Sequence, residues 1–198
     1  MPTGVYRTMD GEGKPTGREE FRCAPGPAGW RYVSTIHVEA GDPHIEIVDL
    51  AVDDTWRPVR LRVDTGEHDL LVNSAGDKLR GARDGERVEL DWRDDVDYLS
   101  PCFNLATARR LGRTAEVQVL YFQPRTLTSS MVAQRYELLG DETVATPAGR
   151  FDTTAWRYTA VESGFTRKLW IAGDVLIDYE GVFQLEALEP GPQGPFPL

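Results

Sequence analysis

Cysteine and histidine are scarce in this sequence. Two cysteines, Cys23 and Cys102, and three histidines occur among 198 residues. The cysteines lie far apart without a CxxC partner, so neither a disulfide framework nor a zinc site is indicated. The histidines lack the HExxH and HxH spacings that bring two imidazoles to one metal ion. We therefore expect no metal site.

Long hydrophobic runs and an excess of basic residues are also missing. The longest mainly apolar stretch, Val117 to Phe122, is far shorter than the ~18 residues of a membrane-spanning helix. The N-terminus, Met1-Pro2-Thr3-Gly4, has no apolar signal segment, so we expect a cytoplasmic protein without a membrane span. With 32 acidic and 22 basic residues the net charge is −10, which opposes binding to nucleic acid.

Motifs of nucleophilic and phosphate chemistry are absent as well. There is no GxSxG elbow and no SxxK pair, and Gly11-Glu12-Gly13-Lys14 lacks the GxxxxGK[ST] frame of a phosphate loop. We expect no bound cofactor. An enzyme that needs only one acid or base, and gains most of its rate from positioning, would leave no such motif.

What the sequence does contain is a series of short segments in which apolar and polar residues alternate. Ile45 to Ile47, Arg60 to Val63 and Val117 to Tyr121 are examples. Turn signals such as Asp84-Gly85 and Gly140-Asp141 separate them at short intervals. Because parallel strands need long crossovers, this spacing predicts an antiparallel meander of about ten or more strands.

The interval from Ser100 to Gly112 predicts one helix. Pro101 suits the first helical position, Arg109 and Arg110 suit the last turn, and Gly112 suits the end. We expect the Ser100 hydroxyl to cap the helix by accepting a hydrogen bond from a backbone N–H. The apolar stripe of the helix predicts that it lies against the sheet or plugs one end of it.

The predicted fold class is therefore all-β with one main helix. A curved antiparallel meander forms an open or half-closed β-barrel, and such barrels can enclose an apolar cavity that their own side chains do not fill. Residues 1–188 form the single barrel-like domain. Residues 189–198, rich in proline and glycine, form a flexible tail.

Candidate ligand contacts are aromatic and basic side chains on neighbouring strands. Under one strand register, four aromatic residues line the cavity and two arginines anchor the polar head of an apolar guest. The aromatic candidates are Trp56, Tyr98, Tyr158 and Trp170, and the anchors are Arg60 and Arg62.

The candidate for proton transfer is His37. It alternates out of the face that carries Ile36 and Val38, and an imidazole can exchange a proton near neutral pH. If the face of His37 lines the cavity, we expect His37 to act as the base, with Asp53 as the next candidate. The alternative is a surface or structural histidine.

Several segments of the C-terminal half follow one another in a characteristic order: Ala108–Leu111, Glu116–Tyr121, Gln134–Tyr136, Tyr158, Gly164–Thr166 and Val175–Phe183. In that order they resemble the bacterial "putative glycolipid-binding" proteins. The resemblance implies the twisted open β-barrel of periplasmic lipoprotein carriers, in which a curved sheet wraps an apolar cavity partly closed by helix. It brings no catalytic residues.

Three functions fit these observations. The first is a binding protein that holds a hydrophobic, lipid-like or polyketide-like small molecule in the barrel cavity. The second is a cofactor-independent cyclase, isomerase or dehydratase that acts on an apolar substrate in the same cavity. The third is an interaction or scaffold protein whose own side chains fill the interior.

Overall fold

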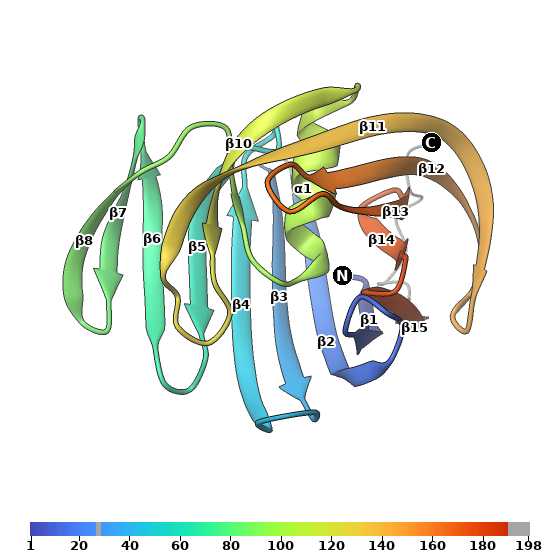
Figure 1. Ribbon diagram of the computed structural model, residues 1–198, viewed down its shortest axis with the longest axis horizontal. Helices are drawn as coiled ribbons and strands as arrows, with labels where there is room; N and C mark the ends of the chain where they lie inside the picture. The colour runs from blue at the N-terminus through green and yellow to red at the C-terminus, as the bar shows by residue number, and fades with distance from the viewer. Residues whose placement is uncertain (27–28, 190–198) are drawn as a thin grey trace.

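The described residues, 1–26 and 29–189 of the computed structural model, form one sheet of fifteen strands with a helix in its hollow (Figure 1). The first eight strands are β1 (Thr3–Met9), β2 (Pro15–Gly26), β3 (Gly29–Val38), β4 (His44–Val52), β5 (Pro58–Asp64), β6 (Asp69–Ala75), β7 (Lys78–Arg83) and β8 (Glu86–Asp91). The next four are β9 (Asp95–Asp97), β10 (Ala115–Phe122), β11 (Ser129–Thr146) and β12 (Gly149–Ala160). The last three are β13 (Phe165–Ala172), β14 (Val175–Tyr179) and β15 (Phe183–Glu189).

The sheet is a meander in which neighbours along the chain are neighbours in space. The order is β8-β7-β6-β5-β4-β3-β2-β1-β15-β14-β13-β12-β11-β10-β9. Every pairing is antiparallel except that of β9 with β10, which is parallel because helix α1 (Pro101–Leu111) connects them. The predicted antiparallel meander with one main helix is thus confirmed. Residues 190–198 of the predicted tail lie outside the described residues.

Short turns set this topology. Between β7 and β8, Asp84 and Gly85 have φ values of 52° and 78°. Two successive left-handed residues are what a two-residue type I′ hairpin requires, and glycine adopts that conformation at little cost. The Asp84 carboxylate also accepts hydrogen bonds from His68 and from the Asp69 backbone, so the turn is held to the preceding hairpin.

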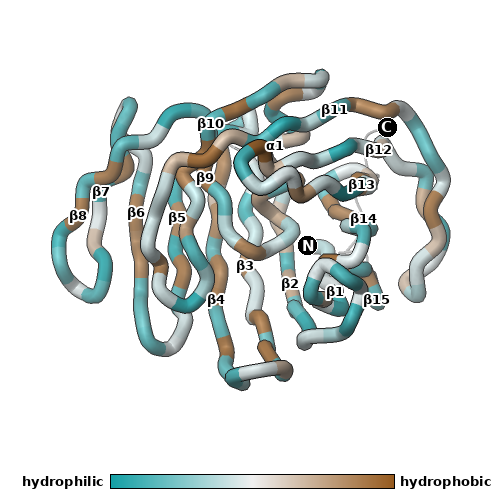
Figure 2. The backbone as a smooth tube through the Cα atoms, in the orientation of Figure 1, coloured by the Kyte–Doolittle hydropathy of each residue, from teal (hydrophilic) through white to brown (hydrophobic). Residues whose placement is uncertain are grey.

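The inner face of the curved sheet is apolar and largely aromatic. Rings stack from strand to strand, with centroid distances of 4.8 Å between Tyr6 and Phe21 and 5.3 Å between Phe21 and Tyr32. The ladder continues to Trp30, 5.6 Å from Tyr32. Figure 2 shows polar and apolar residues alternating along the strands, as expected for a sheet with one wet and one buried face.

Helix α1 lies inside the hollow of the sheet (Figure 1). Pro101 occupies its first turn, and Gly112 ends it in the left-handed conformation with φ 59°. All residues from Pro101 to Ala108 are buried, including the polar Asn104 and Thr107. The helix is therefore a core element enclosed by strands. Helix α1 is too short to cross a membrane, and no other helix occurs among residues 1–26 and 29–189.

The predicted cap at Ser100 is wrong. The Ser100 side chain makes no hydrogen bond to the helix backbone. Its hydroxyl donates instead to Glu19 Oε1, with 2.6 Å between the oxygens. Because Glu19 is fully buried on β2, the Ser100 side chain is turned toward its carboxyl as a donor and not toward the first-turn N–H groups as an acceptor.

The two edge strands of the sheet, β8 and β9, are not hydrogen-bonded to each other, so the barrel is open. The loop of residues 123–128 bridges the gap, and we call its contacts with the other end of the sheet the seam. Arg125 Nη2 lies 2.7 Å from Glu67 Oε1 and 2.8 Å from Asp42 Oδ2. Thr65 donates to the Arg125 carbonyl, and Arg83 donates to the carbonyl of Thr126.

Candidate functional site

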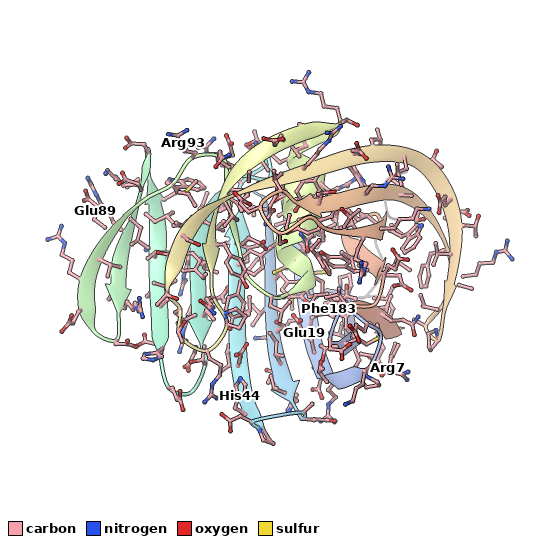
Figure 3. All side chains as sticks on the ribbon, viewed as in Figure 1. Arg7, Glu19, His44, Glu89, Arg93 and Phe183 are labelled. Atoms are coloured by element: carbon pink, nitrogen blue, oxygen red, sulfur yellow. The ribbon has the colours of Figure 1, made fainter. Side chains whose placement is uncertain are left out.

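A cavity of about 660 Å³ lies within the curve of the sheet, beside the N-terminal end of α1. Apolar side chains from distant parts of the chain form most of its wall, which explains why no local motif marks it. Figure 3 shows Phe183 in the interior, whereas Glu89 and Arg93 lie at the periphery. The apolar residues that line the cavity include Ile36, Val38, Val132, Phe165, Val182 and Phe183.

Asp97 places a buried carboxyl in this apolar wall. Its side chain is 8% exposed, and Gln134 Nε2 donates a hydrogen bond to its Oδ2. Burial raises the pKa of Asp97 to about 7, although the hydrogen bonds from Gln134 and from the Tyr98 backbone act in the opposite direction. At neutral pH this carboxyl is therefore present in both protonation states.

A chain of side-chain hydrogen bonds fixes Gln134 in place. Tyr136 donates to Gln134 Oε1 over 3.2 Å, and Asn104 of α1 donates to the Tyr136 hydroxyl over 2.8 Å. Gln134 and Tyr136 are at most 1% exposed. Because the two residues follow each other at a spacing of two on β11, both point inward. The helix and the sheet thus position the group that holds Asp97.

Three tyrosines surround Asp97 and line the same cavity: Tyr121, Tyr158 and Tyr179. Burial is the main cause that raises the pKa of all three tyrosines, and the negative charge of Asp97 raises it further. Tyr158 and Tyr179 are 7% and 5% exposed, and their hydroxyls have no hydrogen-bond partner among the described residues. Their rings lie 5.9 Å apart at an interplanar angle of 71°.

A second polar group lies where β4 faces the residue after β9. Tyr98 donates to Glu46 Oε2 over 2.7 Å, and His44 Nε2 lies 2.9 Å from Glu46 Oε1. Both oxygens of Glu46 are therefore occupied. Burial, together with the charge of Glu46, raises the pKa of Tyr98 well above its ordinary value, so this hydroxyl remains a donor. The contact ties the β9 end of the sheet to β4.

Of the six predicted ligand contacts, the structure brings two into the cavity. Tyr98 and Tyr158 line it. Trp56 instead packs between the Trp30 ring and the guanidinium of Arg109, with a centroid distance of 5.4 Å to Trp30. Trp170 donates to Glu142 Oε2 over 2.7 Å and does not contribute to the wall.

The expected arginine anchors lie on the wrong face. Arg60 and Arg62 are exposed on β5, where they alternate with the buried Leu61 and Val63. Since successive side chains of a strand point to opposite faces, an inward Leu61 forces both arginines outward. Arg62 pairs with Asp64 at 3.3 Å on that outer face. The prediction that these arginines reach the cavity is corrected by this register.

The two predicted catalytic residues also lie outside the cavity. On β3 it is Ile36 and Val38 that face the cavity, so His37 points away from it. His37 Nε2 lies 3.9 Å from Glu20 Oε1, and its side chain is 28% exposed. Asp53 is a half-buried residue at the start of the loop after β4, and its Oδ1 accepts hydrogen bonds from Thr55 and from the Arg57 backbone. Both fit the structural alternative.

The sequence reasoning missed Asp97 and its partners. Asp97 ends the short strand β9, whose first residue is also buried: Asp95 is 1% exposed and pairs with Arg110 at 2.9 Å. A usable signal was present, because Asp95-Val96-Asp97 alternates as a strand directly before the helix. Among residues 1–26 and 29–189, no three metal-ligating side chains cluster as a metal site would require.

The fold and the cavity together define a β-barrel-like protein with an internal site of small-molecule size. The chain belongs to the family described as "Putative glycolipid-binding", whose sequence profile matches residues 11–184, and this confirms the resemblance noted above. Membership supports a ligand-binding role in general terms.

Solved structures share the fold. A DUF1089 family protein from Pseudomonas aeruginosa is 23% identical with a TM-score of 0.62, covering 84% of this chain and 91% of that one. A beta-barrel-like DUF1849 protein from Brucella abortus is 12% identical with a TM-score of 0.55, covering 95% of this chain and 96% of that one. No curated protein matches the chain.

Proposed function

We propose that this protein binds an amphipathic small molecule in the cavity. The observation that carries the proposal is a space of about 660 Å³ whose mainly apolar wall contains the buried carboxyl of Asp97 and the hydroxyls of Tyr158 and Tyr179, which have no hydrogen-bond partner among the described residues. Ligand sites have volumes of roughly 300–1,000 Å³ and combine apolar walls with a few convergent polar groups. A scaffold protein has no need for an interior space of this size.

Native mass spectrometry tests the proposal directly. The protein is purified without detergent from its expression host, and we expect an additional mass of a few hundred daltons that dissociates at higher collision energy. The apolar dye ANS should bind the protein after that guest is removed by organic extraction and refolding. A protein that carries no guest, and that binds neither ANS nor alkyl amphiphiles, would contradict the proposal.

A blocked cavity provides the matched comparison. Ala160 lines the cavity, whereas Ala145 is exposed on the long hairpin of β11 and β12. Ala160→Trp should fill much of the space and abolish both the co-purified mass and dye binding. Ala145→Trp adds the same side chain where it cannot reach the cavity, so binding should be unchanged.

A second candidate function, proton-transfer catalysis on the bound molecule, is favoured by one specific observation. Burial raises the pKa of Asp97 to about 7, which suits a general acid or base at neutral pH, and the hydroxyls of Tyr158 and Tyr179 are available as donors. An isomerase or dehydratase of this kind needs no cofactor. Once the guest is identified, its conversion by the wild type but not by Asp97→Asn would favour catalysis over binding alone.

A further inference from the structure

The charged groups of the cavity are predominantly acidic. Four carboxyl-bearing residues line it, against one arginine and one histidine. Arg125 is already paired with two carboxylates at the seam, and His44 is held by Glu46. Both basic residues that line the cavity are therefore already paired with carboxylates, and neither is free to bind an anionic head group. The carboxyl-bearing residues are Asp10, Glu46, Asp97 and Glu162.

Asp97 differs from the other three carboxyls in its surroundings. Asp10 and Glu162 are exposed at the mouth and accept backbone hydrogen bonds, and both oxygens of Glu46 are bound by side chains. The Asp97 side chain is held by the neutral Gln134, and no arginine, lysine or histidine bonds to it. A buried carboxylate without a cationic partner is electrostatically costly, and a bound cation would relieve that cost.

Aromatic rings line the cavity beside Asp97. The rings of Tyr158 and Tyr179, which both line the cavity, pack edge to face at 71°, and Tyr136 packs behind Tyr158 at 70°. Ring faces attract cations, and aromatic boxes with an adjacent carboxylate bind ammonium groups. The hydroxyls of Tyr158 and Tyr179 add oxygen acceptors for N–H groups.

We propose that the subsite formed by Asp97, Tyr158 and Tyr179 selects an amphiphile whose head is a cationic amine, an inference that rests on the proposed function. The apolar part of the molecule occupies the wall of Ile36, Val132 and its neighbours. Anionic and neutral sugar-like heads on the same tail bind more weakly, because they gain neither the ion pair nor the interaction with the ring faces.

Three probes with one tail test the selectivity: decylamine, sodium decanoate and decyl maltoside. Binding is measured by isothermal titration calorimetry at pH 7.5, below the critical micelle concentration of each probe. Salt at 150 mM screens the general attraction of a cation to a protein of charge −10. We expect decylammonium to bind at least about tenfold tighter than the other two, the size of one charge-assisted contact. Equal or tighter binding of decanoate or decyl maltoside would overturn the inference while leaving the proposed function intact. Failure of all three to bind would instead overturn the proposed function.

Two isosteric variants locate the effect. Asp97→Asn keeps the oxygen that faces Gln134 and should remove the preference for decylammonium. Glu162→Gln removes one charge at the mouth and keeps the oxygen that accepts the Ala133 N–H, so the preference should change less than about twofold. A preference that survives in Asp97→Asn would exclude this subsite.

The pH dependence of ligand binding by the wild-type protein tests the same subsite and requires no variant. A cation binds the ionised form of Asp97, whereas an alkylamine stays protonated up to a pKa of ~10. Affinity for decylammonium should rise about tenfold between pH 6 and 8, since the pKa of Asp97 is about 7. Binding of decyl maltoside should stay level, and a level decylammonium profile would overturn the inference.

The groups that face Asp97 must be considered with it. Asp95 on its own strand raises the pKa of Asp97, and Asp95 is itself paired with Arg110 at 2.9 Å. His44 lines the cavity elsewhere, so the pH series is repeated in His44→Gln, where the same rise is expected. The remaining titratable groups facing Asp97 are Cys102, Tyr121, Tyr136, Tyr158 and Tyr179, and burial raises the pKa of each, so that all are neutral between pH 6 and 8.

Discussion

The Ser100 hydroxyl donates a hydrogen bond to the Glu19 carboxylate, with 2.6 Å between the two oxygens. Glu19 also accepts from Tyr32 over 2.9 Å and has no exposed surface. Its second oxygen has no partner among the described residues. Helix α1 is therefore held at its start by a bond into the core of the sheet, and the residue before the helix also lines the cavity.

Replacing Ser100 should cost more than the loss of a helix cap. Ser100→Ala removes one of two donors to a buried carboxyl, and we expect a loss of about 2 kcal/mol in the free energy of unfolding. Urea denaturation measures it, with the exposed Ser129→Ala as control. In a double-mutant cycle with Glu19→Gln, the two effects should not be additive. Additivity would show that Ser100 acts independently of Glu19.

Stability should fall as the pH rises from about 4.5 to 7. Burial raises the pKa of Glu19 from 4.5 to about 7, so in this range the unfolded chain loses its proton first. The stability that the protonated carboxyl provides is complete below pH 4.5 and is lost by about pH 7, a change of about 3 kcal/mol. Thermal unfolding across this range should show a shallower fall in Glu19→Gln. An identical slope in that variant would contradict the assignment.

The buried pair of Asp95 and Arg110 gives a second prediction that depends on pH. Arg110→Ala leaves Asp95, which is 1% exposed, without its cation and should cost about 3 kcal/mol at pH 7.5. Burial already raises the pKa of Asp95 to about 6, with Arg110 acting against that rise. At pH 5 the carboxyl is protonated in the variant, so the cost should be smaller there. Adding Asp95→Asn should recover part of the loss at pH 7.5.

Close backbone packing at Gly81 gives a fourth prediction. A Cβ atom at Gly81 would overlap the carbonyl oxygen of Leu71 on the neighbouring strand β6. Gly81→Ala should therefore destabilise the protein by about 3 kcal/mol, because backbone atoms must move. At Gly76, where φ is +70° and the space is open, alanine should cost only roughly 1–2 kcal/mol. Chemical denaturation of both variants makes the comparison, and equal costs would show that β6 and β7 separate easily at Gly81.

The architecture followed from patterns that are local in sequence. Turn signals such as Asp84-Gly85 and alternating segments such as Arg60 to Val63 depend on neighbouring residues, and they predicted the meander correctly. The helix between Ser100 and Gly112 followed from its proline and glycine in the same way. The role of Ser100 did not, since a carboxylate 81 positions away competes for its hydroxyl.

The site depended on which face of each strand turned inward, and sequence alternation leaves that choice open. At His37 the pattern was identified correctly, but Ile36 and Val38 face the cavity, so the histidine does not. Tyr98 and Tyr158 were recognised as aromatic candidates and do line the cavity. Asp97 was missed because its burial depends on Gln134, which a strand and a helix separate from it in the chain.

The open edge of the barrel has a mechanical consequence. Backbone hydrogen bonds join neighbouring strands in all fourteen pairings of the sheet. The seam, in contrast, is held by contacts of the side chains of Arg125, Thr65 and Arg83. Widening the molecule along this line breaks ion pairs that water can replace and leaves every ladder intact. Opening the barrel along this line should therefore cost far less than unfolding, because the contacts of Arg125, Thr65 and Arg83 separate while the strands stay paired.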